Sequence, residues 1–323
     1  MEKARTPRGI AIGVMAYNEE GNIGHLLDSL LSQSADAFIE RVYVVASGCT
    51  DATCDIVQRY AARDPRIVLV ADEERRGKVH AVNQFLALAQ APLLVLTSAD
   101  VGFHPTTVER ITAPFSDPRI GVVGAHVVPV NTPDTFTGFA INLMWTLHNE
   151  VSSMKPKMGE MLAFRNVVKP LDASVLADEV SIVCEIERAG YRATYAPDAL
   201  IANCGPGKLT DFVRQRTRWI VCNLQAERDY GVRVSTMDPR LLLRATGGYV
   251  RQDWRRLHWF AGAALIELYA RVRARFEFAT MRSRSDFQLW DQAAGTKSVA
   301  RNDGIHPTAG RVNSTATGRS HDA

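Results

Sequence analysis

The sequence predicts an α/β fold: a mostly parallel, Rossmann-like central sheet flanked by helices, followed by a helical C-terminal region. The first observation is composition, because 46% of the 323 residues are hydrophobic and the chain can therefore bury a sizeable core. The second is the alternation of short apolar runs with helical periodicity along the first 130 residues. Such alternation is typical of βαβ units around a buried sheet.

Each element is predicted from its own local pattern. Strands are expected where apolar runs are short and continuous, at residues 9–17, 41–47, 67–72, 92–100 and 120–130. Helical periodicity between them predicts helices at 22–33, 50–62 and 78–89. Beyond residue 130 the same criteria predict helices at 134–153, 177–189 and 208–230, and strands at 161–165 and 191–196.

Three regions follow from this pattern: a sheet-containing domain at 1–232, a basic helical region at 233–297, and a disordered tail at 298–323 that is rich in Gly, Thr, Ser and Asn. The charge is uneven, with −6 over residues 1–200 and +8 over residues 201–300. The basic part predicts an anionic partner, such as a phosphate group or a membrane surface.

Segment 251–278 contributes six arginines to that basic part. It is apolar in its middle and has tryptophans and arginines at its flanks, which favours one helix lying at a membrane interface. An amphipathic helix packed on the protein's own domain is the alternative. No stretch reaches the ~18 apolar residues of a spanning helix.

The five cysteines are scattered and include no Cys-x-x-Cys pair, so neither a zinc knot nor a disulfide framework is indicated. We therefore expect a reduced, cytoplasmic compartment, with peripheral contact with the cytoplasmic face of a membrane. Nucleic acid is not an expected partner, because no recognised nucleic-acid motif is present.

Polar side chains gather where the predicted strands end, which is where open α/β sheets bind ligands. Asp100 follows a buried apolar strand, where a carboxylate needs a cleft, a cation or hydrogen-bond donors. A divalent metal shared with a diphosphate fits that need, and an ordinary turn-capping aspartate is the alternative.

Lys78 begins a predicted helix, where exposed amides favour anions, so it suits a phosphate ligand better than it suits helix stability. A solvated basic turn is the alternative reading. Asp178 and Glu179 begin another helix, where paired acids either stabilise the first turn or provide a general base.

The helix at 208–230 contains Gln215, Arg218 and Trp219 at spacings that place them on one face. An indole beside a guanidinium and an amide can bind a sugar or a diphosphate. A core tryptophan with solvated arginines is the alternative.

Seven segments in this order resemble the family 2 glycosyltransferases, over roughly residues 8–225. They are AYNEEGNIGHLLDSLLSQ, SGCTDATCDIV, RGKVHAVN, LTSAD, GEMLAFR, ADEVSIVCEIERAGYRATYAPDA and RQRTRW. The resemblance implies the GT-A fold, a nucleotide-sugar donor, and a glycan or lipid-linked acceptor.

The resemblance also implies roles for individual residues. The donor would be bound by Tyr17, Asn18, Glu19, Ser47, Lys78, Ser98 and Asp100, with Mg²⁺ or Mn²⁺ held at Asp100. The acceptor and diphosphate side would use Glu160, Gln215, Arg218 and Trp219, the last three matching Q-x-x-R-W. Glu179, or Asp178 after a small register difference, would deprotonate the acceptor hydroxyl.

Three positions depart from the family pattern. Ala46-Ser47 stands where a pair of aspartates is common, Ser98 replaces the first Asp of D-x-D, and the usual Glu-Asp pair is inverted to Asp178-Glu179. The expected function is an inverting, metal-assisted glycosyltransferase. A non-catalytic GT-A-like scaffold for a membrane or partner, and less so a sugar nucleotidyltransferase, are the alternatives.

Overall fold

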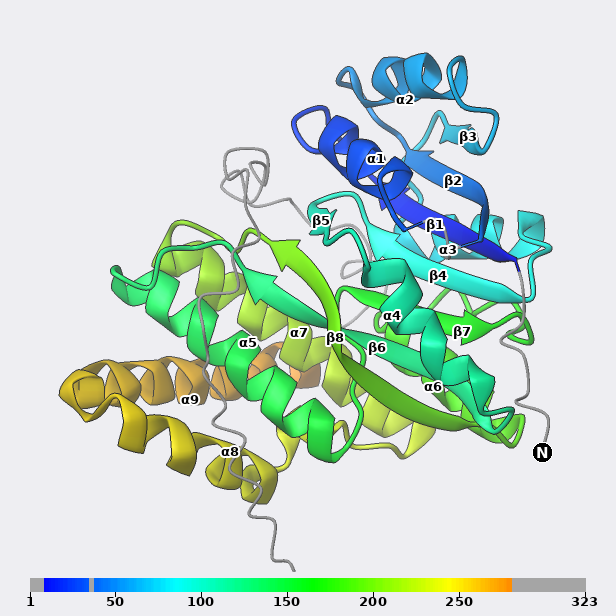
Figure 1. Ribbon diagram of the computed structural model, residues 1–323. Coiled ribbons are helices and arrows are strands. Elements are labelled where there is room, and N and C mark those ends of the chain that lie inside the picture. Colours follow the sequence, from blue (N-terminus) through cyan, green and yellow to red (C-terminus); the bar gives the residue numbers. More distant parts are fainter. Residues whose placement is uncertain (1–8, 35–37, 281–323) are drawn as a thin grey trace, which may run out of the picture.

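The computed structural model describes residues 9–34 and 38–280, without the side chains of residues 248, 249, 251 and 252. One eight-stranded sheet runs through the described chain in the order β3-β2-β1-β4-β7-β6-β8-β5, with helices on both faces (Figure 1). The expected α/β class is confirmed. The predicted tail at 298–323 lies outside the described residues.

Four parallel strands form the N-terminal half of the sheet. They are β1 (Ile10–Ala16), β2 (Ile39–Ser47), β3 (Ile67–Asp72) and β4 (Leu93–Ser98). Every residue of β1 is buried, because the strand is central and covered on both faces. The carboxyl ends of these strands meet at one edge, which places their polar end residues together.

The other half of the sheet is mixed. It comprises β5 (Val101–Phe103), β6 (Ile120–Pro129), β7 (Met161–Arg165) and β8 (Arg192–Asn203). β7 runs antiparallel to both β4 and β6, and β5 runs antiparallel to β8. The short strand β5 was not predicted, because three residues are too few to show a period.

Helices cover the two faces of the sheet separately. One face holds α1 (Ile23–Leu31), α2 (Thr53–Ala61) and α4 (Thr107–Thr112), and the other holds α3 (Lys78–Leu88) and α6 (Asp178–Arg188). α3 approaches β1 closely because Gly13 has no side chain: a Cβ there would lie 2.6 Å from the ring of Phe85.

The remaining helices form a layer beside the second half of the sheet, at the lower left of Figure 1. They are α5 (Phe136–Met154), α7 (Leu209–Tyr230), α8 (Pro239–Gln252) and α9 (Leu257–Thr280). α9 packs against α7 through Ala270 and Ala274, which are fully buried and small enough for close helix approach.

The helix expected around 251–278 is present as α9, but it begins only at Leu257. α8 ends at Gln252, a 3₁₀ turn follows at Trp254–Arg256, and α9 then begins at Leu257. Asp253 starts the turn, with its carbonyl accepting from the Arg256 amide and its carboxylate 3.5 Å from the Arg256 guanidinium. Such local bonding of an Asp competes with helix continuation.

In the described part of the chain, no helix combines the length and the apolarity needed to cross a membrane.

Candidate functional site

The loops after β1 and β2 bind each other at the carboxyl edge of the sheet. Asn18 adopts a left-handed backbone conformation with φ 51°, which asparagine tolerates better than most residues. Its side-chain oxygen accepts from the Thr50 backbone amide at 2.8 Å, and its backbone amide donates to the Cys49 sulfur at 3.4 Å. Tyr17 and Asn18 are therefore held on a rigid edge.

The segment before α3 folds over these two loops. The Arg75 guanidinium lies 3.9 Å from the centre of the Tyr17 ring, and the Arg76 amide donates to the Ser47 hydroxyl at 3.3 Å. Gly48, with φ 63°, permits this approach, because a Cβ there would lie 2.5 Å from the Arg75 nitrogen. Tyr17, Ser47 and two arginines thus form one group.

Glu19 has a structural partner in this loop. It is 6% exposed, and its carboxylate accepts from the Asn22 side chain at 2.8 Å, just before α1 begins. Its backbone amide donates to the Thr53 hydroxyl at 2.7 Å. These bonds hold Glu19 between the first and second loops.

Lys78 begins α3 and points to the carboxylates at the start of α6. Its Nζ lies 3.0 Å from Oδ2 of Asp178, whose side chain is 4% exposed. Burial would lower the pKa of the Lys78 ammonium, but the carboxylates around it, led by Asp178 and Glu179, outweigh burial and raise that pKa. The Lys78 side chain is therefore positively charged and is held in place by Asp178.

Asp100 and Glu160 are two half-buried carboxyl groups near Lys78 and Arg218. Burial raises the pKa of the Asp100 carboxyl, and the two cations only partly offset that effect. Burial and the neighbouring Asp100 carboxylate raise the pKa of Glu160 from its usual 4.5 to about 7. Groups shifted in this way at a cleft mark functional sites.

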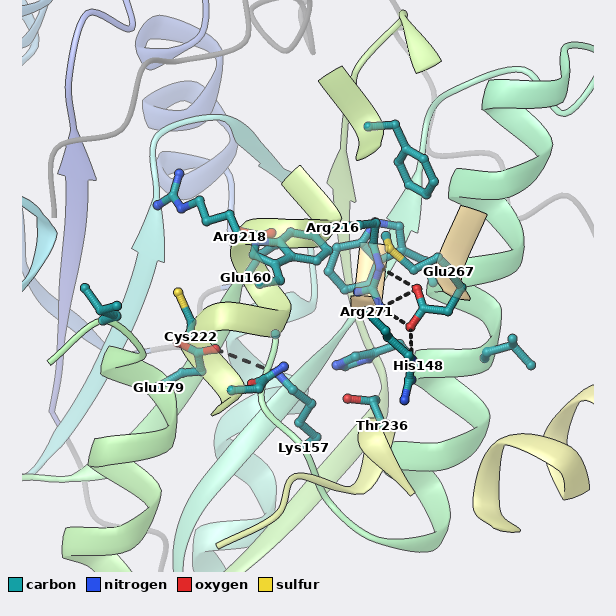
Figure 2. A pocket seen from close by; sticks show the side chains of 18 of the residues that line it. His148, Lys157, Glu160, Glu179, Arg216, Arg218, Cys222, Thr236, Glu267 and Arg271 are labelled. Atoms are coloured by element: carbon teal, nitrogen blue, oxygen red, sulfur yellow. Dashed lines mark hydrogen bonds and ion pairs between the residues drawn. The ribbon is translucent and has the colours of Figure 1, made fainter. Parts of the chain in front are cut away.

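Glu179 follows Asp178 on α6 but is the more accessible of the two. Its side chain is 23% exposed, and its Oε1 lies 3.7 Å from the Lys157 ammonium (Figure 2). Both acids belong to the first turn of α6, where the helix dipole stabilises negative charge. Asp178 pairs with Lys78 and Glu179 with Lys157, and both acids line the adjoining cavity.

A cavity of about 750 Å³ adjoins this charged cluster. Its floor carries predicted residues from four elements: Lys78, Glu160, Asp178, Glu179, Arg218 and Trp219. Its far wall comes from α5, α8 and α9, which sequence reasoning did not connect to the site. The cavity therefore joins the sheet edge to the C-terminal helices.

Two arginines meet one glutamate within the cavity wall, as Figure 2 shows. Arg216 of α7 donates to both carboxylate oxygens of Glu267 at 2.9 Å, and Arg271 donates to one of them at 2.8 Å. Burial would raise the pKa of Glu267, but the two guanidinium groups outweigh it and lower that pKa. The cluster carries a net charge of one positive unit.

Aromatic side chains also line the cavity. The rings of Trp145 and Trp219 lie 5.7 Å apart in an edge-to-face arrangement, and Trp145 also contacts His148 at 5.2 Å. Burial, together with the Lys157 charge, lowers the pKa of His148 to about 3, so its imidazole is neutral. Such a surface suits a sugar ring.

The structure thus brings six of the predicted residues to one cavity and places the others outside its lining. The latter are Tyr17, Asn18, Glu19, Ser47, Ser98, Asp100 and Gln215. Asp100 is nevertheless close enough to Glu160 to influence its pKa. Gln215, predicted to act with Arg218 and Trp219, is not part of the lining.

Sequence reasoning missed Lys157, Glu267 and Arg271. The last two had a signal, because an acid and a base four residues apart interrupt the apolar middle of segment 251–278. Charges in such a position need a buried partner. That partner, Arg216, lies 51 residues away along the chain.

The residues at Asp100 fit a divalent cation in one respect. The Asp100 Oδ1 atom is buried and accepts no hydrogen bond from the described residues, and carboxylate oxygen is a ligand that Mg²⁺ and Mn²⁺ prefer. Over residues 9–34 and 38–280, no group of three or more His, Cys, Asp or Glu side chains is placed to hold a metal. Further ligands would have to come from a diphosphate.

Comparison with solved structures gives a similar fold. The mannosyltransferase PcManGT from Pyrobaculum calidifontis, in complex with GDP-Man and Mn²⁺, superposes with a TM-score of 0.59. The two chains are 23% identical, and the match covers 85% of this chain and 88% of that one. The likeness shows that the fold is GT-A.

Comparison with curated proteins gives remote relatives. An N-acetylglucosaminyltransferase from Rhizobium meliloti (strain 1021) is 24% identical over 228 residues, which are 64% of this chain and 53% of that protein. One from Rhizobium sp. (strain N33) is 25% identical over 229 residues, or 64% and 50%. The chain spans about half the length of these relatives.

One curated relative has a higher sequence identity over a shorter match. The 4,4'-diaponeurosporenoate glycosyltransferase from Staphylococcus aureus (strain bovine RF122 / ET3-1) is 34% identical over 96 residues, or 30% of this chain and 25% of that protein. The sequence model described as "Glycosyltransferase like family 2" matches residues 7–222, which is more than half of the chain. The chain therefore belongs to glycosyltransferase family 2.

Proposed function

We propose that the protein moves a sugar from a nucleotide-sugar donor to a hydroxyl of a glycan or lipid-linked acceptor, with metal assistance and inversion at the anomeric carbon. The observation that carries this proposal is the arrangement at the cavity floor. Lys78 and Arg218 supply positive charge, Glu179 supplies an accessible carboxylate, and all three line one cavity.

The donor side is supported by the cluster at the sheet edge. Tyr17, Ser47 and the arginines before α3 form a surface for the nucleotide, next to the N-terminus of α3. Lys78 at that terminus would neutralise charge on the leaving diphosphate, because amides and an ammonium group converge there.

Glu179 would take the proton from the acceptor hydroxyl. Asp178, 3% exposed and paired to Lys78, would instead hold that lysine in place. An accessible carboxylate such as that of Glu179 suits direct displacement, in which the acceptor oxygen bonds to the anomeric carbon as the bond to the diphosphate breaks. A divalent cation bound at Asp100 would stabilise the charge on that diphosphate.

The test incubates the protein and Mn²⁺ with a panel of nucleotide sugars, with and without glycans or a bacterial lipid extract. Nucleoside diphosphate release from one donor, stimulated by an acceptor, is expected, and the anomeric configuration of the product reports inversion. Absence of release from every donor would contradict the proposal.

Glu179→Gln is expected to lower the transfer rate by about 10²–10⁴-fold, because a positioned base contributes that much. Glu185→Gln is a matched control, since Glu185 lies on the same helix but pairs with Arg188 at the surface. Equal rates in the Glu179 variant and the wild type would exclude Glu179 as the base.

A further inference from the structure

The far half of the cavity is apolar and is built by helices outside the catalytic floor. Its wall is lined by aliphatic and aromatic side chains of α5, α8 and α9: Leu143, Leu147, Leu242, Leu243, Phe260 and Leu268. A sugar or a nucleotide does not need such a wall, because both are covered with hydroxyl groups or charges. Apolar lining instead favours a hydrocarbon.

The mouth of this half is apolar as well. Leu243 of α8 is 75% exposed and Leu268 of α9 is 59% exposed, and yet both line the cavity. Contact between these exposed side chains and an apolar group extending out of the cavity is favourable, because it removes apolar surface from water. The mouth therefore offers an exit for a chain too long to be enclosed.

The pair of arginines on Glu267 lines the same cavity as Leu243 and Leu268. Arg216 and Arg271 share that one carboxylate, so a positive unit is left without an anionic counterpart within the cluster. An anionic group entering the cavity would be attracted by this net positive charge, and guanidinium groups are good donors to phosphate. Glu267 holds both guanidinium groups in place.

We propose that the acceptor is an anionic amphiphile. Its hydroxyl faces Glu179, its anionic group lies against Arg216 and Arg271, and its hydrocarbon chain passes between α8 and α9 at Leu243 and Leu268. This inference rests on the proposed function, because it assigns the acceptor of the same site.

Decyl phosphate, kept below its micelle concentration, is the probe, and isothermal titration calorimetry measures its binding to the full chain. Saturable binding is expected, and glycerol phosphate, which has the same head but no chain, should bind at least about tenfold more weakly. Equal binding of the two probes, or no saturable binding of decyl phosphate, overturns the proposal.

The double substitution Leu243→Asp with Leu268→Asp should weaken decyl phosphate binding by about tenfold or more. Leu265→Asp is the matched control, because Leu265 is 67% exposed on α9 but does not line the cavity. All three leucines are exposed, so the variants should fold, which thermal melting checks. An equal loss in the control overturns the proposal.

Nucleoside diphosphate release from the donor is measured on the same protein samples. A protein that turns over its donor but does not bind decyl phosphate overturns the acceptor class alone. A protein that binds decyl phosphate as expected but turns over no donor contradicts the proposed function instead.

Discussion

Asp100 and Glu160 are two half-buried carboxyl groups that share Lys78 and Arg218 as neighbouring cations. Asp100 Oδ1 has no hydrogen-bond partner among the described residues, and both carboxyl groups have raised pKa values. Two such groups resist simultaneous ionisation, because each desolvated charge repels the other. A divalent cation would relieve that repulsion, which ties this site to metal assistance.

Asp100→Asn should therefore remove the stimulation of transfer by Mn²⁺, because the amide keeps the shape of the side chain but not its charge. Transfer rates at increasing Mn²⁺ concentration measure the effect. Undiminished Mn²⁺ stimulation in the variant would exclude Asp100 as the ligand.

The raised pKa of Glu160 predicts that the stability of the metal-free protein depends on pH. Because its pKa is raised from 4.5 to about 7, the folded protein binds the proton more tightly than the unfolded chain does. The resulting stabilisation is fully present below about pH 4.5 and is lost as pH rises to about 7.

Glu160→Gln removes this titration, so the wild type should lose up to about 3 kcal/mol relative to the variant between pH 4.5 and pH 7. Urea unfolding at the two pH values measures the difference. A constant difference between the two proteins would show that Glu160 has an ordinary pKa.

At the scale of elements, α9 has two faces with different surroundings. One side packs on α7 through Ala270 and Ala274 and carries Glu267 into the cavity wall. The opposite side leaves Leu265, Val272 and Phe276 exposed. Of the two readings of this segment, packing on the enzyme accounts for the first side, and an external apolar environment remains our prediction for the second.

Glu267→Gln should destabilise the protein by about 2 kcal/mol or more, because it leaves Arg216 and Arg271 partly buried without their shared carboxylate. Glu277→Gln is the matched control on α9, since its pair with Arg273 is more exposed and should contribute about 0–1 kcal/mol. Urea unfolding compares the two variants, and equal losses would contradict a special role for the Glu267 cluster.

At the scale of the whole molecule, the basic charge and the exposed apolar residues coincide on the C-terminal helices. Trp254 and Phe276 are each 70% exposed, and Arg255, Arg273 and Arg275 are exposed beside them. Interfacial helices combine apolar and basic residues in this way. We therefore predict peripheral contact with an anionic membrane.

Sedimentation with vesicles tests this contact. The protein should sediment with vesicles that contain anionic lipid and less so at high salt, because screening weakens charge attraction. Leu265→Asp with Val272→Asp should reduce the bound fraction without changing donor turnover. No sedimentation of the wild type at low salt would contradict the prediction.

Much of this architecture was readable from local sequence. The strand at 161–165 matches β7, and the helix at 177–189 differs from α6 by one residue at each end. Strong hydrophobic periodicity and clear boundary signals make such elements predictable. Lys78, Glu179, Arg218 and Trp219 are predicted from residue type and spacing, and the structure places all four in the lining of one cavity.

Only the tertiary structure decided how distant segments combine. The antiparallel course of β7, the break at Asp253 and the pairing of Arg216 with Glu267 depend on contacts between residues far apart or on competition between local bonds. Local periodicity carries no information about such partners. The sequence thus determined the candidate residues by type and spacing, whereas the cavity that joins six of them to an apolar wall arises from packing.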